Sequence, residues 1–415
     1  MKKQRLLIVL LPFLLTACGL GAKKMKNIAE LTPKLSVESN EAIQIDPSTI
    51  TSIFTPEALN KNKEYSFTTS TIIAEPVFNN NIIYTISKNG KVSAFSRQDN
   101  TILWSCNVSV DKSDNYFGGG ILYYKNKLYV TYGARSMVIL DSQTGHEIVR
   151  KELLDISRTT PVLINDHTIL VQTISNQALA VNIDSLNFVW QHEGTAEILS
   201  SSYHTSPIAH NGYVIVNYSS GQIFALNADD GQVLWVHDLS NEQEISLPNF
   251  EAASTLCKPI INKADMYLAN SAGKVIKVNI MTGDILWQTK AEDVQSMSLS
   301  GNNLFITNNA GQIAIISTNS GKVKFVADLN ELQDAKKVKV ASFLAPIISQ
   351  TSHGWNINII STKGVLYTLQ SENNILSTSP QFTKIVKNIE YYGKINHDEM
   401  YFSTNKKIIF VNSKK

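Results

Sequence analysis

The stretch SSGQIFALNADDGQVLW, residues 219–235, is the clearest copy of a unit that recurs along the chain. Gly221 stands where a tight hairpin turn needs a positive φ angle, which glycine adopts without steric cost. Residues 223–226 place apolar side chains on both faces of a strand, as burial between two layers requires. A turn at residues 229–231 then leads into a second strand that ends at Trp235. The stretch therefore predicts two β-strands joined by tight turns.

The same pattern returns at GKVSAFSRQDNTILW (90–104), GKVIKVNIMTGDILW (273–287) and GQIAIISTNSGKVKF (311–325). The hairpin-turn positions recur about every 45 residues, a spacing typical of propeller blades. They are Gly90, Gly133, Asn176, Gly221, Gly273, Gly311, Gly364 and Asn405. A proline recurs at a similar spacing, and we expect it in the innermost strand of a blade. These prolines are Pro76, Pro161, Pro207, Pro259 and Pro346. Four short strands in each unit predict an all-β fold, an eight-bladed β-propeller with four-stranded antiparallel blades.

The last unit is one strand short. From residue 387 to the end there is room for three strands only. A blade with an open edge would be prone to aggregation, so the missing strand must come from elsewhere. The segment EYSFTT, residues 64–69, is a lone strand-like stretch before the first blade. We expect this N-terminal strand to complete the eighth blade and close the ring.

Four tryptophans occupy equivalent positions in the outer strands, and the repeat predicts that they pack between blades. They are Trp104, Trp190, Trp235 and Trp287. Trp355 lies outside this register. It either covers a loop or contributes to binding.

The amino terminus carries a targeting signal. Residues 1–17 have a basic start, a ten-residue apolar run and small residues before a cysteine, as in a signal peptide. The ending LTAC resembles the bacterial lipoprotein signal, which implies that Cys18 is acylated and becomes the first mature residue. Gly19 follows in place of the Asp that marks retention in the inner membrane, which favours the periplasmic face of the outer membrane. We expect residues 18–63 to form a lipidated tether and residues 64–415 to form the propeller.

The composition gives no support for nucleic-acid binding. Hydrophobic residues make up 43% of the chain, which is ample for a core, and the net charge is +2. Removal of Lys2, Lys3 and Arg5 with the signal peptide leaves the mature chain close to neutral, without the basic stripe that nucleic acid requires.

The sequence also lacks the spacing of known catalytic and metal motifs. The eight histidines show no metal-ligand spacing, and the glycines at 118–120 lack the Lys-Ser/Thr of a phosphate loop. We read these glycines as a close backbone approach, and Asp229 and Asp230 as turn residues. Cys106 and Cys257 fall on opposite sides of an eight-bladed ring, so a disulfide between them is not expected. We therefore expect no catalytic residue, no metal and no cofactor.

The run Thr-Gly-Asp-Ile-Leu-Trp at 282–287 resembles the repeat of pyrroloquinoline-quinone-type propellers. With a lipoprotein signal and a single ring, the chain resembles the BamB family. The resemblance implies a non-catalytic scaffold of the outer-membrane β-barrel assembly (BAM) complex. Such a scaffold binds the periplasmic POTRA domains of BamA, works beside other BAM lipoproteins and assists the insertion of nascent β-barrel proteins.

The resemblance also implies where partners bind, on the loops that lead into two adjacent blades in the middle of the ring. The matching positions are Leu199, Ser200, Ser201, Ser202 and Tyr203 in one loop, and Glu251, Ser254 and Leu256 in the next. The family tends to carry an Arg in the first loop and Asp in the second, whereas this chain has Ser202, Ser254 and Leu256. Independently of the family, 238–256 is the longest connection in the first five blades, and long loops on rigid rings commonly bind partners. The loop at 328–342 is an alternative candidate for a partner-binding loop.

Two other functions remain open. A propeller that binds glycan or peptidoglycan would gather exposed aromatic residues on one face, for which Tyr116, Phe117 and Trp355 are candidates. A quinoprotein dehydrogenase on the same fold would need metal-ligating Glu, Asn and Asp residues and, in many members of that family, a vicinal cysteine pair. The chain has no Cys-Cys pair.

Overall fold

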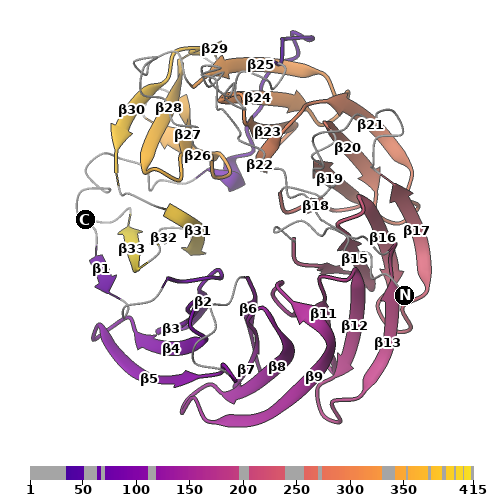
Figure 1. The fold of residues 1–415 in the computed structure, drawn as a ribbon. Helices are drawn as coiled ribbons and strands as arrows, with labels where there is room; N and C mark the ends of the chain where they lie inside the picture. The colour runs from indigo at the N-terminus through magenta and orange to yellow at the C-terminus, as the bar shows by residue number, and fades with distance from the viewer. Residues whose placement is uncertain are drawn as a thin grey trace, which may run out of the picture.

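The computed structural model describes thirteen stretches of the chain. These are residues 34–50, 63–66, 71–110, 118–195, 205–238, 257–269, 273–329, 342–351, 354–372, 375–385, 389–396, 399–404 and 406–412. Its strands form eight antiparallel sheets arranged as blades around a ring (Figure 1). The predicted eight-bladed β-propeller is confirmed. No helix within the described stretches is long and apolar enough to cross a membrane.

Blades 1 to 4 follow one another along the chain, each running from its innermost to its outermost strand. Blade 1 contains β2 (Val77–Asn79), β3 (Ile82–Ile86), β4 (Lys91–Ser96) and β5 (Thr101–Asn107). Blade 2 contains β6 (Gly120–Tyr124), β7 (Lys127–Thr131), β8 (Ala134–Asp141) and β9 (Glu147–Ser157). Blade 3 contains β10 (Val162–Asn165), β11 (Thr168–Gln172), β12 (Gln177–Asn182) and β13 (Phe188–Glu193). Blade 4 contains β14 (Ile208–His210), β15 (Tyr213–Asn217), β16 (Gln222–Asn227) and β17 (Val233–Asp238).

Blades 5 and 6 repeat this order, and blades 7 and 8 depart from it. Blade 5 contains β18 (Ile260–Asn262), β19 (Asp265–Ala269), β20 (Lys274–Asn279) and β21 (Ile285–Lys290). Blade 6 contains β22 (Val294–Ser300), β23 (Asn303–Asn308), β24 (Gln312–Ser317) and β25 (Val323–Asp328). Blade 7 contains β26 (Ile347–Thr351), β27 (Gly354–Ile360) and β28 (Val365–Glu372), which pairs with both β29 (Ile375–Leu376) and β30 (Gln381–Lys384). Blade 8 contains β31 (Ile389–Asn396), β32 (Glu399–Thr404), β33 (Lys407–Asn412) and β1 (Lys63–Ser66).

The ring is closed by strands from opposite ends of the chain. β1 pairs antiparallel with β33, from Lys63 opposite Phe410 to Ser66 opposite Lys407. Figure 1 shows β1, in indigo, beside the yellow β33. The prediction that a strand near residue 64 completes the eighth blade is confirmed, and the described strand covers Lys63–Ser66. Residues 67–69 lie outside the described stretches.

The middle strands are the most buried because each blade is covered on both faces by its neighbours. All five residues of β11 are buried, whereas β13 has one buried residue among half-buried and exposed positions. One core cluster between blades 3 and 4 brings Leu170 and Ala178 against Val214 and Val216. Apolar residues on both faces of a strand, the pattern first seen at 223–226, thus follow from the stacking of blades.

The turn residues have the conformation that the repeat predicts. Gly90, Gly133, Gly221, Gly273, Gly311 and Gly364 have positive φ angles, and Asn176 has a φ of 58°. Asn405 lies outside the described residues. Gly118 and Gly120 lie close to other backbone, since a Cβ on Gly118 would be 2.8 Å from the carbonyl oxygen of Arg158. The expected close approach is confirmed.

The prolines are placed differently from the prediction. Each of the five comes directly before the innermost strand instead of within it, as Pro76 does before Val77 and Pro207 before Ile208. Proline has no N–H group for a strand ladder, so it is tolerated at the approach to a strand and not inside it.

Part of the predicted tether lies against the ring. Residues 34–50 follow blade 6, with a short 3-10 turn, η1 (Pro47–Thr49), near their end. Leu35 packs against the core between blades 5 and 6, and Ile43, Ile45 and Ile50 pack against the core between blades 6 and 7. We call residues 34–50 the strap. The sequence shows no strand or helix period here because the strap is held by scattered apolar side chains and single hydrogen bonds.

Candidate functional site

The ring has two faces with different connections. Because neighbouring strands are antiparallel, the turns between second and third strands lie on the same face as the connections between blades. We call this the loop face. It carries the turns at Gly90, Asn176, Gly221 and Gly311. The opposite face carries the turns between first and second strands and between third and fourth strands.

All eight predicted partner-binding residues belong to two connections between blades whose described ends lie on the loop face. Leu199, Ser200, Ser201, Ser202 and Tyr203 fall in residues 196–204, and Glu251, Ser254 and Leu256 fall in residues 239–256. Both segments lie outside the described residues, as do Cys18, the signal peptide and most of the rival loop at 328–342. The described residues on either side show where the two connections start and finish.

Both ends of the first connection are hydrogen-bonded to the blades beside it. The Thr195 N–H donates to Oε1 of Gln222 at 3.0 Å, and Nδ2 of Asn176 donates to the Thr195 carbonyl oxygen at 2.8 Å. At the other end, Nδ2 of Asn217 donates to Oγ1 of Thr205 at 3.1 Å. Gln222 and Asn217 belong to blade 4, so this blade fixes the span of the first connection.

The second connection starts beside the first. Gln222, which accepts from Thr195 through its side chain, pairs through its backbone with Asp238, the last residue of β17. Residues 239–256 begin directly after Asp238 and finish at Cys257, which is buried with 8% of its surface exposed. Gln222 therefore stands between the starting points of the two connections.

A layer of buried polar residues underlies the first connection. Nε2 of Gln172, a side chain with no exposed surface, donates to the carbonyl oxygen of Asn217 at 2.6 Å. Oγ1 of Thr159 donates to the Gln172 carbonyl oxygen at 3.3 Å, and the Thr160 N–H donates to Oγ of Ser206 at 3.0 Å. Buried hydrogen bonds of this kind fix geometry, so the described ends of the first connection are held by a rigid base.

Sequence reasoning missed this layer. Its signal is a polar residue at the end of an apolar strand, directly before a loop-face turn: Gln172 after Ile169, Leu170 and Val171, and Asn217 after Val214, Ile215 and Val216. The repeat draws attention to the turn that follows and not to these strand ends.

The two histidines that follow blade tryptophans pack between blades. Nδ1 of His192 lies 2.8 Å from the Tyr218 hydroxyl, and burial lowers the pKa of His192 and raises that of Tyr218. His237 contacts the carbonyl oxygen of Gly283 in blade 5. Among the described residues, no group of three or more His, Cys, Asp or Glu side chains could hold a metal ion.

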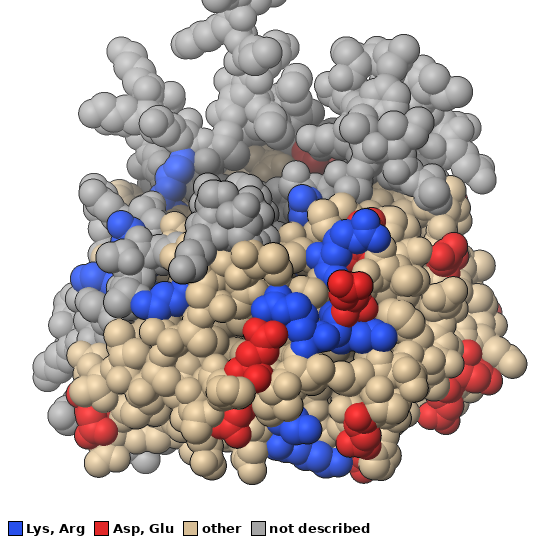
Figure 2. All heavy atoms as spheres, turned by 60° about the horizontal axis from the view of Figure 1, so that its bottom comes forward, with Lys and Arg blue, Asp and Glu red and all other residues tan. Residues whose placement is uncertain are grey.

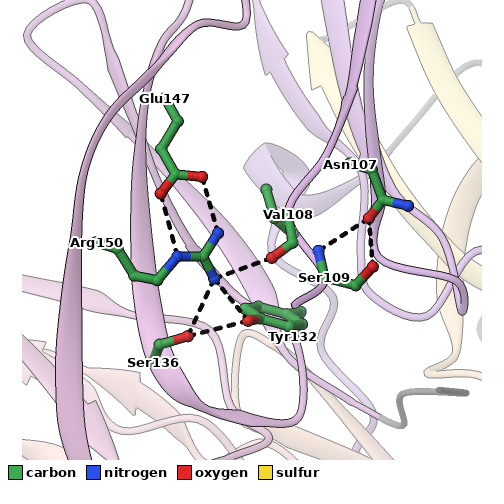
Figure 3. Close-up of polar contacts among 7 residues, drawn as sticks. All are labelled: Asn107, Val108, Ser109, Tyr132, Ser136, Glu147 and Arg150. Carbon is green, nitrogen blue, oxygen red and sulfur yellow. Dashed lines mark hydrogen bonds and ion pairs between the residues drawn. The ribbon is translucent and has the colours of Figure 1, made fainter. Parts of the chain in front are cut away.

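A hydrogen-bonded cluster around Arg150 joins blades 1 and 2. The Arg150 guanidinium donates to both carboxylate oxygens of Glu147, at 3.1 and 2.8 Å, and to the Tyr132 hydroxyl at 2.8 Å (Figure 3). It also donates at 3.0 Å to the carbonyl oxygen of Val108, which follows β5 of blade 1. Its donors are directed to acceptors of the protein on both sides of the interface, so the cluster links blades.

Cys106 and Cys257 are free thiols, as expected. Burial raises the pKa of Cys106 to about 11, with a further contribution from the nearby Glu147, and burial raises the pKa of Cys257 to about 12. Both thiols are therefore protonated and unreactive near neutral pH.

The aromatic residues considered for glycan binding do not form a described surface. Trp355 is 6% exposed and belongs to the core between blades 6 and 7, so its role is packing. Tyr116 and Phe117 lie outside the described residues.

Comparison with known families and proteins gives a consistent result. A family model described as "Outer membrane protein assembly factor BamB" matches residues 88–326. An uncharacterized protein of Rickettsia conorii is 50% identical over 410 residues, covering 98% of this chain and 99% of its own. One of Rickettsia prowazekii is 48% identical over 411 residues, covering 98% and 99%.

Two solved structures share the fold. The crystal structure of BamB from Moraxella catarrhalis matches with a TM-score of 0.64 and 16% identity, over 83% of this chain and 99% of that one. The crystal structure of the computationally designed Ika8 protein matches with a TM-score of 0.61 and 11% identity, over 84% and 98%. At these identities the two matches show the propeller fold and nothing finer.

Proposed function

This chain belongs to the BamB family of outer membrane protein assembly factors, and from that membership we propose that it is a non-catalytic scaffold lipoprotein of the BAM complex. In this proposal Cys18 carries the lipid, and the protein sits on the periplasmic face of the outer membrane. Its loop face binds the POTRA domains of BamA, beside other BAM lipoproteins, and assists the insertion of β-barrel proteins.

The observation that carries the proposal is that the residues directly before the two predicted contact loops, Thr195 and Asp238, both contact Gln222. Its side chain holds Thr195 at the start of residues 196–204, and its backbone pairs with Asp238 at the start of residues 239–256. Two connections that start side by side on a rigid base can offer one continuous surface to a folded partner. This arrangement supports a binding surface shared by blades 4 and 5.

The test is recovery of partners from the native envelope. Tagged full-length protein is purified from detergent-solubilised envelope, and the proteins that accompany it are identified by mass spectrometry. A second protein has residues 199–203 replaced by Gly and Ser at equal length. A matched control, His167→Ala with Asp184→Ala, changes an exposed pair on the opposite face of blade 3.

We expect BamA with the parent and with the control, and a large loss of BamA with the 199–203 replacement. All three proteins should share one melting temperature, which excludes unfolding as the cause of the loss. Recovery of no barrel-assembly component with the parent would reject the scaffold proposal, and sedimentation with peptidoglycan would then test the glycan alternative.

A further inference from the structure

The outermost strand of blade 6 is covered, whereas the outermost strands of neighbouring blades are exposed. Val323 and Lys324, the first two residues of β25, are 1% and 7% exposed. The residues at the same distance before the blade tryptophan in blades 4 and 5 are between 45% and 49% exposed: Val233, Leu234, Ile285 and Leu286. Figure 2 shows the rim on another side of the ring, where uncharged surface lies open between scattered charged side chains.

The strap covers β25 by lying along its outer edge (Figure 1). The N–H groups of Glu38 and Ser39 donate to the Val323 carbonyl oxygen at 2.8 and 3.0 Å, and the Val323 N–H donates to the Glu38 carboxylate at 3.2 Å. Nζ of Lys324 donates to the carbonyl oxygen of Ala42 at 3.2 Å. The strap thus satisfies backbone groups that an edge strand otherwise offers to solvent.

Blade 6 also lacks the tryptophan that packs against the next blade elsewhere. We call the contact surface between two neighbouring blades a seam. At the seam between blades 5 and 6, Trp287 lies against Gly321 and donates to the carbonyl oxygen of Thr318 at 2.9 Å. Phe325 has the equivalent pairing position in blade 6, and its ring is smaller and has no N–H group. Residues 373–380, which follow β28 in blade 7, contain no glycine.

The strap packs into this seam between blades 6 and 7. Ile43, Ile45 and Ile50 pack against the core cluster that contains Phe325 of blade 6 and Ile357 of blade 7. All three isoleucines are half-buried. They therefore add apolar contacts at a seam where the pairing of tryptophan with glycine is absent.

The strap is held without being part of a sheet. The Glu41 carboxylate accepts hydrogen bonds of 2.6 Å from Ser317 and from Ser320, and the Asp46 N–H donates to Oγ of Ser300 at 3.0 Å. Residues 34–50 contribute no strand to any of the eight sheets, and blade 6 has four strands of its own. The strap can consequently leave the ring without breaking the ladder of a blade.

We propose that the strap is a releasable lock on the seam between blades 6 and 7. When docked, it supplies the apolar contacts that a tryptophan supplies at other seams. When it undocks, this seam opens while the other blades stay folded, because segments held by few apolar contacts and single hydrogen bonds open at a lower free energy than strand ladders do. The proposal is independent of the proposed function, since it requires neither a lipid on Cys18 nor BamA.

The experiment measures how fast a buried cysteine in each of two seams reacts with a disulfide reagent. The full-length chain with Cys18→Ser, Cys106→Ala and Cys257→Ala receives one new cysteine, either Ile357→Cys or Val214→Cys. A cysteine at either position reacts only when its seam opens, because neither native side chain has any exposed surface.

The two reporter positions are matched. Ile357 pairs with Leu369 in blade 7 as Val214 pairs with Leu226 in blade 4, at the same distance from the hairpin-turn glycine. Ile357 belongs to the core between blades 6 and 7, and Val214 belongs to the core between blades 3 and 4. Position 214 therefore reports on a seam that the strap does not touch.

Three changes in the strap are compared in both reporter chains. Ile43→Ser combined with Ile45→Ser removes apolar contacts to the seam. Glu41→Gln is a milder change, which keeps the shape of the side chain and removes its charge. Val37→Ser is the control, because Val37 lies on the same strap and is 53% exposed.

We expect the double serine variant to label about tenfold or more faster at position 357, with no change at position 214. Glu41→Gln should give a smaller increase at position 357, and Val37→Ser should give none. An unchanged rate at position 357 in both strap variants would overturn the proposal, because the seam would then hold without the strap. An equal increase at positions 357 and 214 would also overturn it, because the strap would then support the ring as a whole.

Discussion

Gly231 of blade 4 lies directly against the indole of Trp190 in blade 3. A Cβ placed on Gly231 would be 2.6 Å from Cδ2 of that ring, closer than real carbon atoms approach. The indole Nε1 donates to the carbonyl oxygen of Ala228 in the same turn at 3.0 Å. The absence of a side chain at Gly231 thus makes room for the large tryptophan side chain of the preceding blade.

The same fit recurs around the ring. Trp104, Trp235 and Trp287 lie against Gly145, Gly283 and Gly321 of the following blade, and each indole donates to a carbonyl oxygen there. The interface between blades 2 and 3 shows the reverse arrangement. Val149 occupies the tryptophan position, and Leu186 takes the glycine position with a φ of 58°. At this interface the smaller side chain, Val149, comes from the earlier blade and the larger one, Leu186, from the later blade. Both pack in one core cluster.

A first prediction separates backbone strain from the clash with the indole. Gly231→Ala and Gly212→Ala both force alanine to a positive φ, at +72° and +80°, but a Cβ on Gly212 meets nothing within 4 Å. We expect Gly212→Ala to lower the free energy of unfolding by about 1–2 kcal/mol and Gly231→Ala by a further 1–3 kcal/mol. Denaturant titration of both variants measures the difference. Equal effects would mean that the indole moves aside freely.

A second prediction concerns exchanging the large and the small side chain across the interface between blades 3 and 4. Trp190→Val should open a cavity and cost about 2–4 kcal/mol, and Gly231→Leu should clash with the indole. Together they reproduce the Val149 and Leu186 arrangement, so the double variant should be more stable than the sum of the single effects by about 0.5–3 kcal/mol. A double-mutant cycle in urea gives the coupling. Simple additivity would show that the two positions do not share one space.

A third prediction tests the closure of the ring. Tyr65 of β1 pairs with Ile408, and proline there disturbs the ladder of a four-residue strand. We expect Tyr65→Pro to destabilise the protein by about 3 kcal/mol or more and to promote aggregation through the exposed edge of β33. Tyr65→Val, which keeps the strand conformation, is the control and should melt near the parent. Thermal melting with light scattering distinguishes the two; an unaffected proline variant would mean that β1 is dispensable.

A fourth prediction is a pH dependence of the strap. Hydrogen bonds from Ser317 and Ser320, and the charge of Lys324, lower the pKa of Glu41 below 4.5. The ionised carboxylate therefore stabilises the docked strap above pH 4.5, and this stabilisation is lost as the pH falls through the lowered pKa. A dye on Val37→Cys should gain mobility below pH 4.5, as followed by fluorescence anisotropy. The same measurement on Glu41→Gln should show no step in that pH range, and a step there would assign the effect to another group.

A fifth prediction follows from the two thiols, of which Cys257 is buried and Cys106 half-buried. In a Cys18→Ser chain, Cys106 and Cys257 are the only thiols. Their raised pKa values should make both react at least about 100-fold more slowly with a disulfide reagent at pH 8 than an exposed cysteine does. Both should react rapidly once denaturant unfolds the ring. Fast labelling of the native chain would show that these interfaces open.

Sequence periodicity predicted what repeats. Gly221 and its equivalents mark the turns, Trp190 and its equivalents mark the interfaces, and the incomplete last unit pointed to closure by β1. These features follow from local chain geometry and from apolar patterns, which a single sequence records directly.

Structural features that do not recur from blade to blade were not predicted from the sequence. The strap depends on contacts nearly 300 residues apart, such as Glu41 with Ser317, and no local pattern indicates them. The burial of Trp355 depends on how blade 7 packs against blade 6. For the proposed binding surface, the sequence shows only the order of the two loops along the chain, and the fold brings their starting points together at Gln222.

The closure of blade 8 also sets an order of events during folding. β1 is synthesised before every other strand of the ring, and its partner β33 is synthesised after the rest of the ring, within the last residues of the chain. β1 therefore has no hydrogen-bonded partner strand while the other seven blades are synthesised and fold. Closing such a loop is slow and costs chain entropy, so ring assembly ends with a single late step that depends on the whole chain. A polypeptide interrupted before Lys407 keeps β1 without a partner, however well its earlier blades have folded.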